Sequence, residues 1–174
     1  MTSTTNFAEN FDANQIPLPG VPFRVFLGSS DAAHCSLTTL RKHKITHILV
    51  AGLGLDMPHK TSDIKHLKLK LIDLPLQTLT PSLSTSCDFI ASVAAGDAVL
   101  VHCARGVSRS ASIVIAFVSR TLGCSYEEAA FIVRKARPCI CPNAGFEQEL
   151  RVWCREQQIV AVATKQAPQE DELN

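Results

Sequence analysis

The chain has 174 residues, a length that suits one domain built around a single hydrophobic core. Hydrophobic residues make up 46% and charged residues 19%, as in soluble globular proteins, and a formal net charge of +1 gives no reason to expect nucleic acid or an anionic membrane as a partner. No apolar run approaches the roughly 20 residues that span a bilayer, and no basic segment followed by an apolar block opens the chain, so neither a membrane anchor nor a secretory signal is expected.

The first part of the chain alternates short strands and helices behind a polar segment. Residues 1–16 are polar and show no periodicity, so we expect a flexible tail there. Phe23–Leu27 is predicted to be a strand, Ser36–His43 a helix, and the apolar run Ile45–Val50 a second strand. His66–Leu71 alternates polar and apolar residues, which is typical of a strand with one buried face.

The same alternation continues further along the chain. Thr80 followed by Pro81 is a cap-and-start signal for a helix that runs to about Ala95. Ala98–Val101 is a continuous apolar run, as expected for a strand at the centre of a covered sheet. Ser110–Leu122 is apolar nearly all round, which predicts a buried central helix.

Two more helices complete the predicted elements. Ser125 and Glu128 have the spacing of a capping box and open a helix to about Arg137, and a last helix is expected over 143–158. Residues 161–174 end in an acidic run and are expected to form a disordered tail. Strands that alternate with helices in this way predict an α/β fold with a mainly parallel sheet flanked by helices.

The chain contains seven cysteines at irregular spacings. Their odd number and the missing secretory signal indicate free thiols in a reducing compartment, that is, a cytoplasmic and/or nuclear location. Most of these thiols are expected to be buried as small hydrophobic side chains. Cys139 and Cys141 are two positions apart, but no second Cys or His pair lies near them to complete a zinc site, and no metal or cofactor is expected.

One cysteine, Cys103, lies in a segment whose pattern predicts chemistry. A predicted strand ends just before it, Arg109 follows six positions later, and a predicted helix comes next. A loop of this length can curl so that its backbone N–H groups converge on one point, with the helix N-terminus beneath, and Gly106 supplies backbone freedom within the curl. The segment therefore predicts a cradle for a phosphate group; a buried cysteine in an ordinary turn is the plainer alternative.

Within such a cradle the two ends of the loop have different tasks. The forked guanidinium of Arg109 can bind two phosphate oxygens at once. The same positive surroundings lower the pKa of a thiol, so Cys103 is expected to be a thiolate and a nucleophile at neutral pH.

The loop resembles the signature of the cysteine-based protein phosphatases, in the form found in their dual-specificity branch. Its sequence here is His-Cys-Ala-Arg-Gly-Val-Ser-Arg-Ser-Ala over residues 102–111, and the segments 45–49 and 137–146 are also similar to the family's pattern. The resemblance implies a central, mostly parallel five-stranded sheet flanked by helices in one phosphatase domain over residues 17–160. It implies a phosphate-binding loop made of Cys103, Ala104, Arg105, Gly106, Val107, Ser108 and Arg109.

Hydrolysis of a phosphate ester also needs an acid that protonates the leaving oxygen. Asp73 directly follows a predicted strand, where parallel strands deliver residues to the carboxyl edge of the sheet. The resemblance places the acid about thirty residues before the nucleophile, and Asp73 is thirty before Cys103. A turn residue at a strand end is the plainer interpretation of the same aspartate.

Three further residues have expected roles through the resemblance. Ser110 is similar to the hydroxyl that assists breakdown of the phosphocysteine; a helix N-cap is its plainer interpretation, and the two roles are compatible. His102 precedes the nucleophile and is expected to orient the loop by hydrogen bonding. Asn143 is similar to a residue that braces the phosphate loop, with the N-cap of the last helix as the alternative.

The sequence therefore predicts a phosphatase that acts on phosphotyrosine and on phosphoserine/phosphothreonine through a phosphocysteine intermediate. Phosphoproteins are its expected partners, and the oligomeric state stays open. Two alternatives remain: a phosphoinositide or RNA 5′-phosphatase of the same superfamily, and a phosphoprotein-binding module without activity. The first would be favoured by extra basic residues inside the loop, which offers only Arg105; the second is disfavoured because Cys103, Arg109 and Asp73 are all present.

Overall fold

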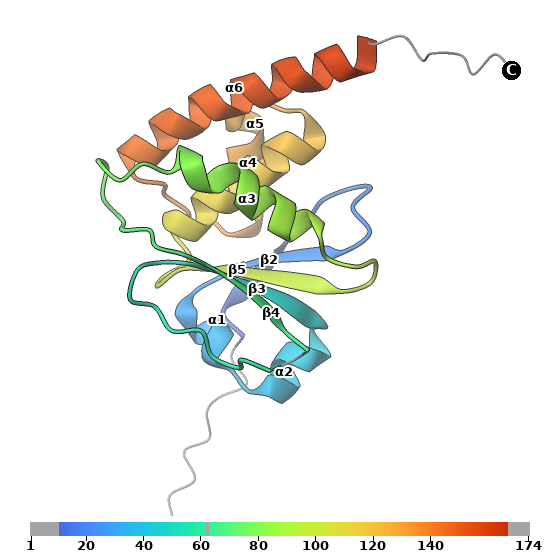
Figure 1. Ribbon diagram of the computed structural model, residues 1–174, viewed down its shortest axis with the longest axis vertical. Coiled ribbons are helices and arrows are strands. Elements are labelled where there is room, and N and C mark those ends of the chain that lie inside the picture. The colour runs from blue at the N-terminus through green and yellow to red at the C-terminus, as the bar shows by residue number, and fades with distance from the viewer. Residues whose placement is uncertain (1–10, 62, 167–174) are drawn as a thin grey trace, which may run out of the picture.

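The computed structural model describes residues 11–61 and 63–166, which form a sandwich of helices on both faces of one sheet (Figure 1). The sheet has five strands in the order β1-β2-β5-β3-β4. These are β1 (Ala13–Ile16), β2 (Arg24–Gly28), β3 (Ile45–Ala51), β4 (Lys65–Leu69) and β5 (Ala98–His102). Only the pair β1 and β2 is antiparallel, so the expected α/β fold with a mostly parallel sheet is confirmed.

Two short helices cover one face of the sheet and four longer ones cover the other (Figure 1). The short helices are α1 (Ser30–His34) and α2 (Leu37–Lys42). The four on the opposite face are α3 (Thr80–Ala91), α4 (Arg109–Leu122), α5 (Tyr126–Ala136) and α6 (Ala144–Gln166). Among the helices of the described residues, none has both the length and the hydropathy that a membrane span requires.

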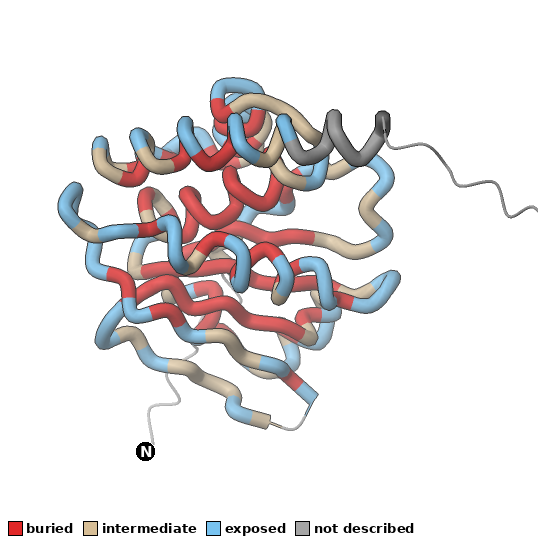
Figure 2. Tube along the Cα trace, turned by 45° about the horizontal axis from the view of Figure 1, so that its top comes forward, coloured by how far each residue is buried: buried red, intermediate tan, exposed pale blue. Residues whose placement is uncertain are grey.

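Side chains of the central strand β5 alternate between two hydrophobic clusters. Val99 and Val101 join the cluster under α3–α6, whereas Leu100 joins the smaller cluster under α1 and α2. All five residues of β5 are buried, and the central strands are the most buried part of the sheet (Figure 2). This double burial explains why the strand reads as a continuous apolar run, and it fixes the start of the loop that follows.

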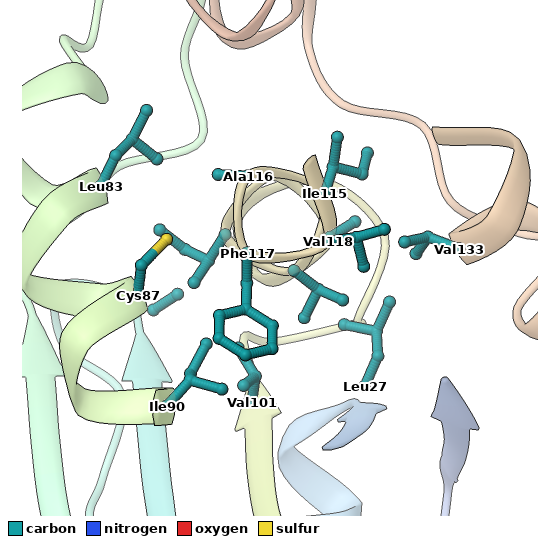
Figure 3. Packing of buried hydrophobic residues seen from close by; sticks show 14 of the residues in the cluster. Leu27, Leu83, Cys87, Ile90, Val101, Ile115, Ala116, Phe117, Val118 and Val133 are labelled. Carbon is teal, nitrogen blue, oxygen red and sulfur yellow. The ribbon is translucent and has the colours of Figure 1, made fainter. Parts of the chain in front are cut away.

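Helix α4 lies at the centre of the larger cluster. Figure 3 looks along α4 and shows Phe117 directed toward Val101 on the sheet, with side chains of α3 on one side and Val133 of α5 on the other. Burial of an Ile or Phe side chain is worth about 1.5–3 kcal/mol, and α4 buries ten consecutive residues from Ser110 to Ser119. The N-terminus of α4 is thereby held against the end of β5.

The N-terminal tail is shorter than the sequence predicts. A flexible tail is expected over residues 1–16, yet residues 13–16 form β1, which pairs with β2. Only Ile16 of this strand is buried, so its sequence shows no alternation of polar and apolar residues from which a strand could be predicted. The expectation is wrong for residues 13–16; residues 1–10 lie outside the described part.

The last helix is longer than predicted, and the expected C-terminal tail 161–174 is wrong for residues 161–166. Helix α6 continues to Gln166 because no Gly or Pro interrupts the sequence between Gly145 and Pro168. Residues 167–174 of that tail lie outside the described residues.

The cap residue of α3 is not the one that the sequence predicts. Thr80 is the first helical residue rather than the cap, which is Leu79. The backbone N–H groups of Leu79 and Thr80 donate hydrogen bonds to Glu149 of α6.

Candidate active site

The loop between β5 and α4, residues 103–108, is curled tightly enough to need glycine at one position. Gly106 has a φ of +69°, and a Cβ placed on it would lie 2.6 Å from the carbonyl oxygen of Gly28 at the end of β2. A side chain here is therefore excluded both by backbone conformation and by contact with the neighbouring strand. The curl predicted from the sequence is present.

The sulfur of Cys103 lies inside this curl, and the residue is only 2% exposed. It accepts hydrogen bonds from the backbone N–H of Gly106 at 3.2 Å and from the hydroxyl of Ser110 at 3.1 Å. Burial by itself would raise the pKa of the Cys103 thiol, but hydrogen bonds from the Ser110 side chain and from the backbone N–H groups of Ser110, Gly106 and Val107 lower that pKa below its ordinary value. Cys103 is thus favoured as a thiolate.

Four other cysteines show the opposite behaviour. Burial raises the pKa of Cys87 to about 12 and that of Cys154 to about 11, and it also raises the pKa of Cys35 and Cys124. These thiols stay protonated and act as hydrophobic side chains. The contrast singles out Cys103 as the reactive thiol of this group.

Arg109 begins α4 and lines the same cavity as Cys103. Its side chain is mostly buried and its Nη1 lies against Gly52, at the end of β3, where a Cβ would come within 2.9 Å. Its buried Nε has no hydrogen-bond partner in the part of the chain that the structure describes. A fixed guanidinium with an unused donor is suited to bind an oxyanion.

Asp73 lies across the same cavity and is held on the loop by its neighbours. Its Oδ1 accepts hydrogen bonds from the Ser108 hydroxyl at 2.7 Å and from Asn143 Nδ2 at 2.9 Å, and its Oδ2 lies 3.7 Å from Arg109 Nε. Asn143 also accepts a hydrogen bond from the backbone N–H of Phe146 at 3.0 Å, so it caps the last helix and contacts the site at once. The structure brings the expected acid, Asn143 and the loop together.

His102 and Ser110 take different positions around Cys103. His102 is fully buried, with Nδ1 3.3 Å from the carbonyl oxygen of Cys103. Burial lowers the pKa of His102 to about 4, so the ring is neutral at pH 7 and can orient the loop without carrying a charge. Ser110 lies inside the first turn of α4 and not at its cap, which is Ser108.

Arg137 is a residue of the site that sequence reasoning did not assign. It is 5% exposed and lies behind the loop, where its Nε donates to the carbonyl oxygen of Gly106 at 3.1 Å and its Nη2 to that of Arg105 at 3.2 Å. Its Nη1 donates to Asp12 at 3.1 Å and to Asn14 at 2.8 Å. By binding carbonyl groups from behind, Arg137 helps to turn the N–H groups of the loop toward the cavity.

Cys103, Arg109, Asp73 and Asn143 line one cavity of about 320 Å³. Its walls are Asp73, Cys141, Asn143 and the loop 103–109 except Gly106. A larger hollow of about 480 Å³ lies on α5, but its only thiol, that of Cys124, has a raised pKa. The smaller cavity combines a stabilised thiolate, a guanidinium and a carboxyl group, and it is the candidate active site.

Residues 25–156 match the family model of the dual specificity phosphatase catalytic domain. The chain belongs to the dual specificity phosphatase family. Mouse dual specificity protein phosphatase 19 is 39% identical over 130 residues, which cover 74% of this chain and 58% of that protein. Human serine/threonine/tyrosine-interacting protein is 36% identical over 140 residues, covering 77% of this chain and 61% of that one. The chain thus spans about three fifths of the length of these two family members.

Solved structures of the family share the fold. The human tyrosine phosphatase-like serine/threonine/tyrosine-interacting protein is 32% identical, with a TM-score of 0.73 over 88% of this chain and 99% of that one. A mouse protein solved in complex with zinc tungstate is 26% identical, with a TM-score of 0.77 over 93% of this chain and 96% of that one. These likenesses confirm the fold class that the resemblance implies.

Proposed function

We propose that this chain hydrolyses phosphate monoesters on phosphotyrosine and on phosphoserine or phosphothreonine of proteins, through a phosphocysteine intermediate on Cys103. The observation that carries the proposal is the hydrogen-bonded sulfur of Cys103 in the cavity that Arg109 and Asp73 also line. Membership of the family supports the same reaction. A nucleophilic thiolate works only while it is reduced, so we also propose a cytoplasmic or nuclear location.

In the first step, the thiolate of Cys103 attacks phosphorus and the bond to the leaving oxygen breaks. Asp73, in its protonated form, gives its proton to that oxygen. Because Oδ1 of Asp73 already accepts two hydrogen bonds, the proton is carried by Oδ2, on the side of Arg109. Arg109 and the loop N–H groups stabilise the charge on the remaining phosphate oxygens.

In the second step, the carboxylate of Asp73 accepts a proton from a water molecule, whose oxygen attacks phosphorus. The bond from phosphorus to the sulfur of Cys103 breaks, and inorganic phosphate is released. The departing thiolate is stabilised by the hydroxyl of Ser110, which donates to the sulfur. Each step leaves Asp73 in the protonation state that the next one requires.

The surroundings of the cavity favour a protein substrate over a lipid headgroup or an RNA end. Among the described residues that line it, Arg105 is the one cation besides Arg109, so few groups could bind additional phosphates. Exposed leucines flank the site: Leu53 follows Gly52 and Leu74 follows Asp73, and both side chains are more than half exposed. Apolar side chains next to a phosphorylated residue could pack on them.

Turnover of an aryl phosphate by the purified chain tests the reaction. Cys103→Ser should abolish turnover, whereas Cys139→Ser, which changes an exposed cysteine in the same way, should leave it unchanged. Phosphopeptides and phosphoinositides assayed side by side then test the substrate class. Equal turnover by Cys103→Ser would contradict the mechanism, and a clear preference for phosphoinositides would contradict the protein substrate.

A phosphoprotein-binding module is the second candidate, because one relative at 36% identity is named a serine/threonine/tyrosine-interacting protein. The presence of Cys103, Arg109 and Asp73 in one cavity argues for catalysis instead. Binding of phosphopeptides without any turnover by the unaltered chain would favour the module.

A further inference from the structure

The middle of the segment that carries Asp73 has little buried surface of its own. This segment, here called the acid loop, comprises residues 70–79 between β4 and α3. Residues 72–76 are all exposed, and the Leu76 side chain is 97% exposed. Leu71 and Leu79, near the two ends of the acid loop, are buried in the core. Hydrophobic burial contributes little between them, so the position of Asp73 also depends on the polar contacts and the backbone packing that attach the loop.

The beginning of α6 supplies two of these attachment points. Asn143, just before the helix, donates the hydrogen bond to Asp73 Oδ1 at 2.9 Å. Gly145 packs directly on Pro75, because a Cβ at position 145 would overlap the carbonyl oxygen of Pro75. The middle of the acid loop therefore rests on the backbone of α6.

Glu149 supplies the third attachment point, one helical turn after Gly145 and thus on the same face of α6. Its carboxylate accepts hydrogen bonds from the backbone N–H of Leu79 at 3.0 Å and of Thr80 at 2.8 Å, and from the hydroxyl of Thr80 at 2.5 Å. Leu79, at the cap position of α3, makes no side-chain cap of its own. A carboxylate from another helix therefore binds the N–H groups where the acid loop ends.

Glu149 is negatively charged, which suits an acceptor at the N-terminus of α3. Burial would raise the pKa of Glu149, but its hydrogen bonds with Thr80 and Leu79 outweigh that effect and lower the pKa. Glu149 is therefore ionised at neutral pH, and a negative charge at a helix N-terminus is stabilised by the helix dipole. The attachment joins two helices that are about 70 residues apart in sequence.

We propose that Glu149 is a positioning residue for leaving-group protonation, because it fixes the end of the acid loop and with it the carboxyl group of Asp73. The inference rests on the proposed phosphatase activity and adds a residue that does not touch the substrate. Loss of Glu149 should affect the proton donor while the nucleophile and the phosphate loop stay intact, since Glu149 makes no contact with Cys103 or Arg109 among the hydrogen bonds of the described residues.

The test compares leaving groups of different basicity. A phosphotyrosine peptide needs the proton of Asp73 more than p-nitrophenyl phosphate does, because nitrophenolate leaves readily without one. Glu149→Ala should lower kcat for the peptide about tenfold more than kcat for p-nitrophenyl phosphate, as expected for partial loss of general-acid catalysis. Glu149→Gln keeps one acceptor oxygen and should restore most of the loss, and Glu156→Ala, at an exposed position two turns further along α6, should match the unaltered chain.

A double variant separates positioning from general damage. In an Asp73→Asn background, Glu149→Ala should produce no further difference between the two substrates, because the proton donor is already absent. Should Glu149→Ala fail to fold, Gly145→Ala, which displaces Pro75, should give the same dependence on the leaving group. Equal losses for both substrates, or none, would overturn the inference. Absence of turnover in the unaltered chain would instead overturn the proposed function.

Discussion

The hydroxyl of Ser110 donates a hydrogen bond of 3.1 Å to the sulfur of Cys103 from within the first turn of α4. This bond stabilises the thiolate more than the thiol, so Ser110→Ala should raise the pKa of Cys103. A hydrogen bond to a charged group is worth about 1.5–3 kcal/mol, so the rise should be large enough to measure. The rate of alkylation by iodoacetamide as a function of pH measures the shift.

The matched control for that experiment is Ser119→Ala on the same helix, since the Ser119 hydroxyl donates to the carbonyl oxygen of Cys124. The alkylation profile of Cys103 should be unchanged in this control. An unchanged profile in Ser110→Ala would show that the hydroxyl does not stabilise the thiolate.

Gly106→Ala should destroy the phosphate-binding loop. The residue would need a φ of +69°, and its Cβ would lie 2.6 Å from the carbonyl oxygen of Gly28. A displaced loop misaligns the groups around the phosphate, so turnover should fall by about 100-fold or more, and inhibition by tungstate should weaken with it. Gly20→Ala has a similar φ of +80° with open space around the Cβ and should keep full activity. Retained tungstate inhibition in Gly106→Ala would contradict the role of the curl.

Arg137→Met should destabilise the fold. The change leaves the carbonyl groups of Gly106 and Arg105 and the carboxylate of Asp12 without their donor. Leaving a buried carbonyl group without its donor costs about 1–3 kcal/mol, whereas the carboxylate of Asp12, which is 43% exposed, adds little; urea unfolding can measure the loss. Arg120→Met breaks an exposed ion pair with Asp88 and should cost less than about 1 kcal/mol. Equal losses in the two variants would contradict a special role for Arg137.

The contact of Asp12 with Arg137 should also make stability depend on pH. The hydrogen bond from Arg137 holds the pKa of Asp12 below its ordinary value, so the carboxylate stabilises the folded state at any pH above the unfolded pKa of about 3.9. This contribution is lost as the pH falls through the lower folded pKa. The stability difference between the unaltered chain and Asp12→Asn should be constant between about pH 5 and 8 and shrink toward about pH 3. A difference that grows on acidification would contradict the assignment.

The parts of the fold that the sequence predicts well are those whose determinants are local. Strand β5 is buried on both faces and helix α4 nearly all round, so each appears as a continuous apolar run. The reactive loop lies between them, and its spacing of Cys103 and Arg109 is fixed within seven residues. Asp73 could be proposed because the carboxyl ends of parallel strands meet at one edge of the sheet.

The parts that the sequence does not predict depend on contacts between distant segments. Arg137 and Asp12 are 125 positions apart, and no local pattern indicates that they meet. Strand β1 has a single buried residue, Ile16, and exists because β2 offers it a free edge. Thr80 has the sequence of a helix cap, yet Glu149 provides the acceptor instead, because α6 brings a carboxylate to that position.

The pairing of β1 with β2 has a practical consequence for where the chain can be cut. A truncation that begins at residue 17 would discard the two side-chain acceptors of the Arg137 guanidinium, Asp12 and Asn14, although both lie outside the segment that matches the family. It would also leave β2 as an exposed edge, which invites association of neighbouring molecules through their sheets. Shortened versions of this chain should therefore retain residues 11–16, and tags are better joined ahead of them.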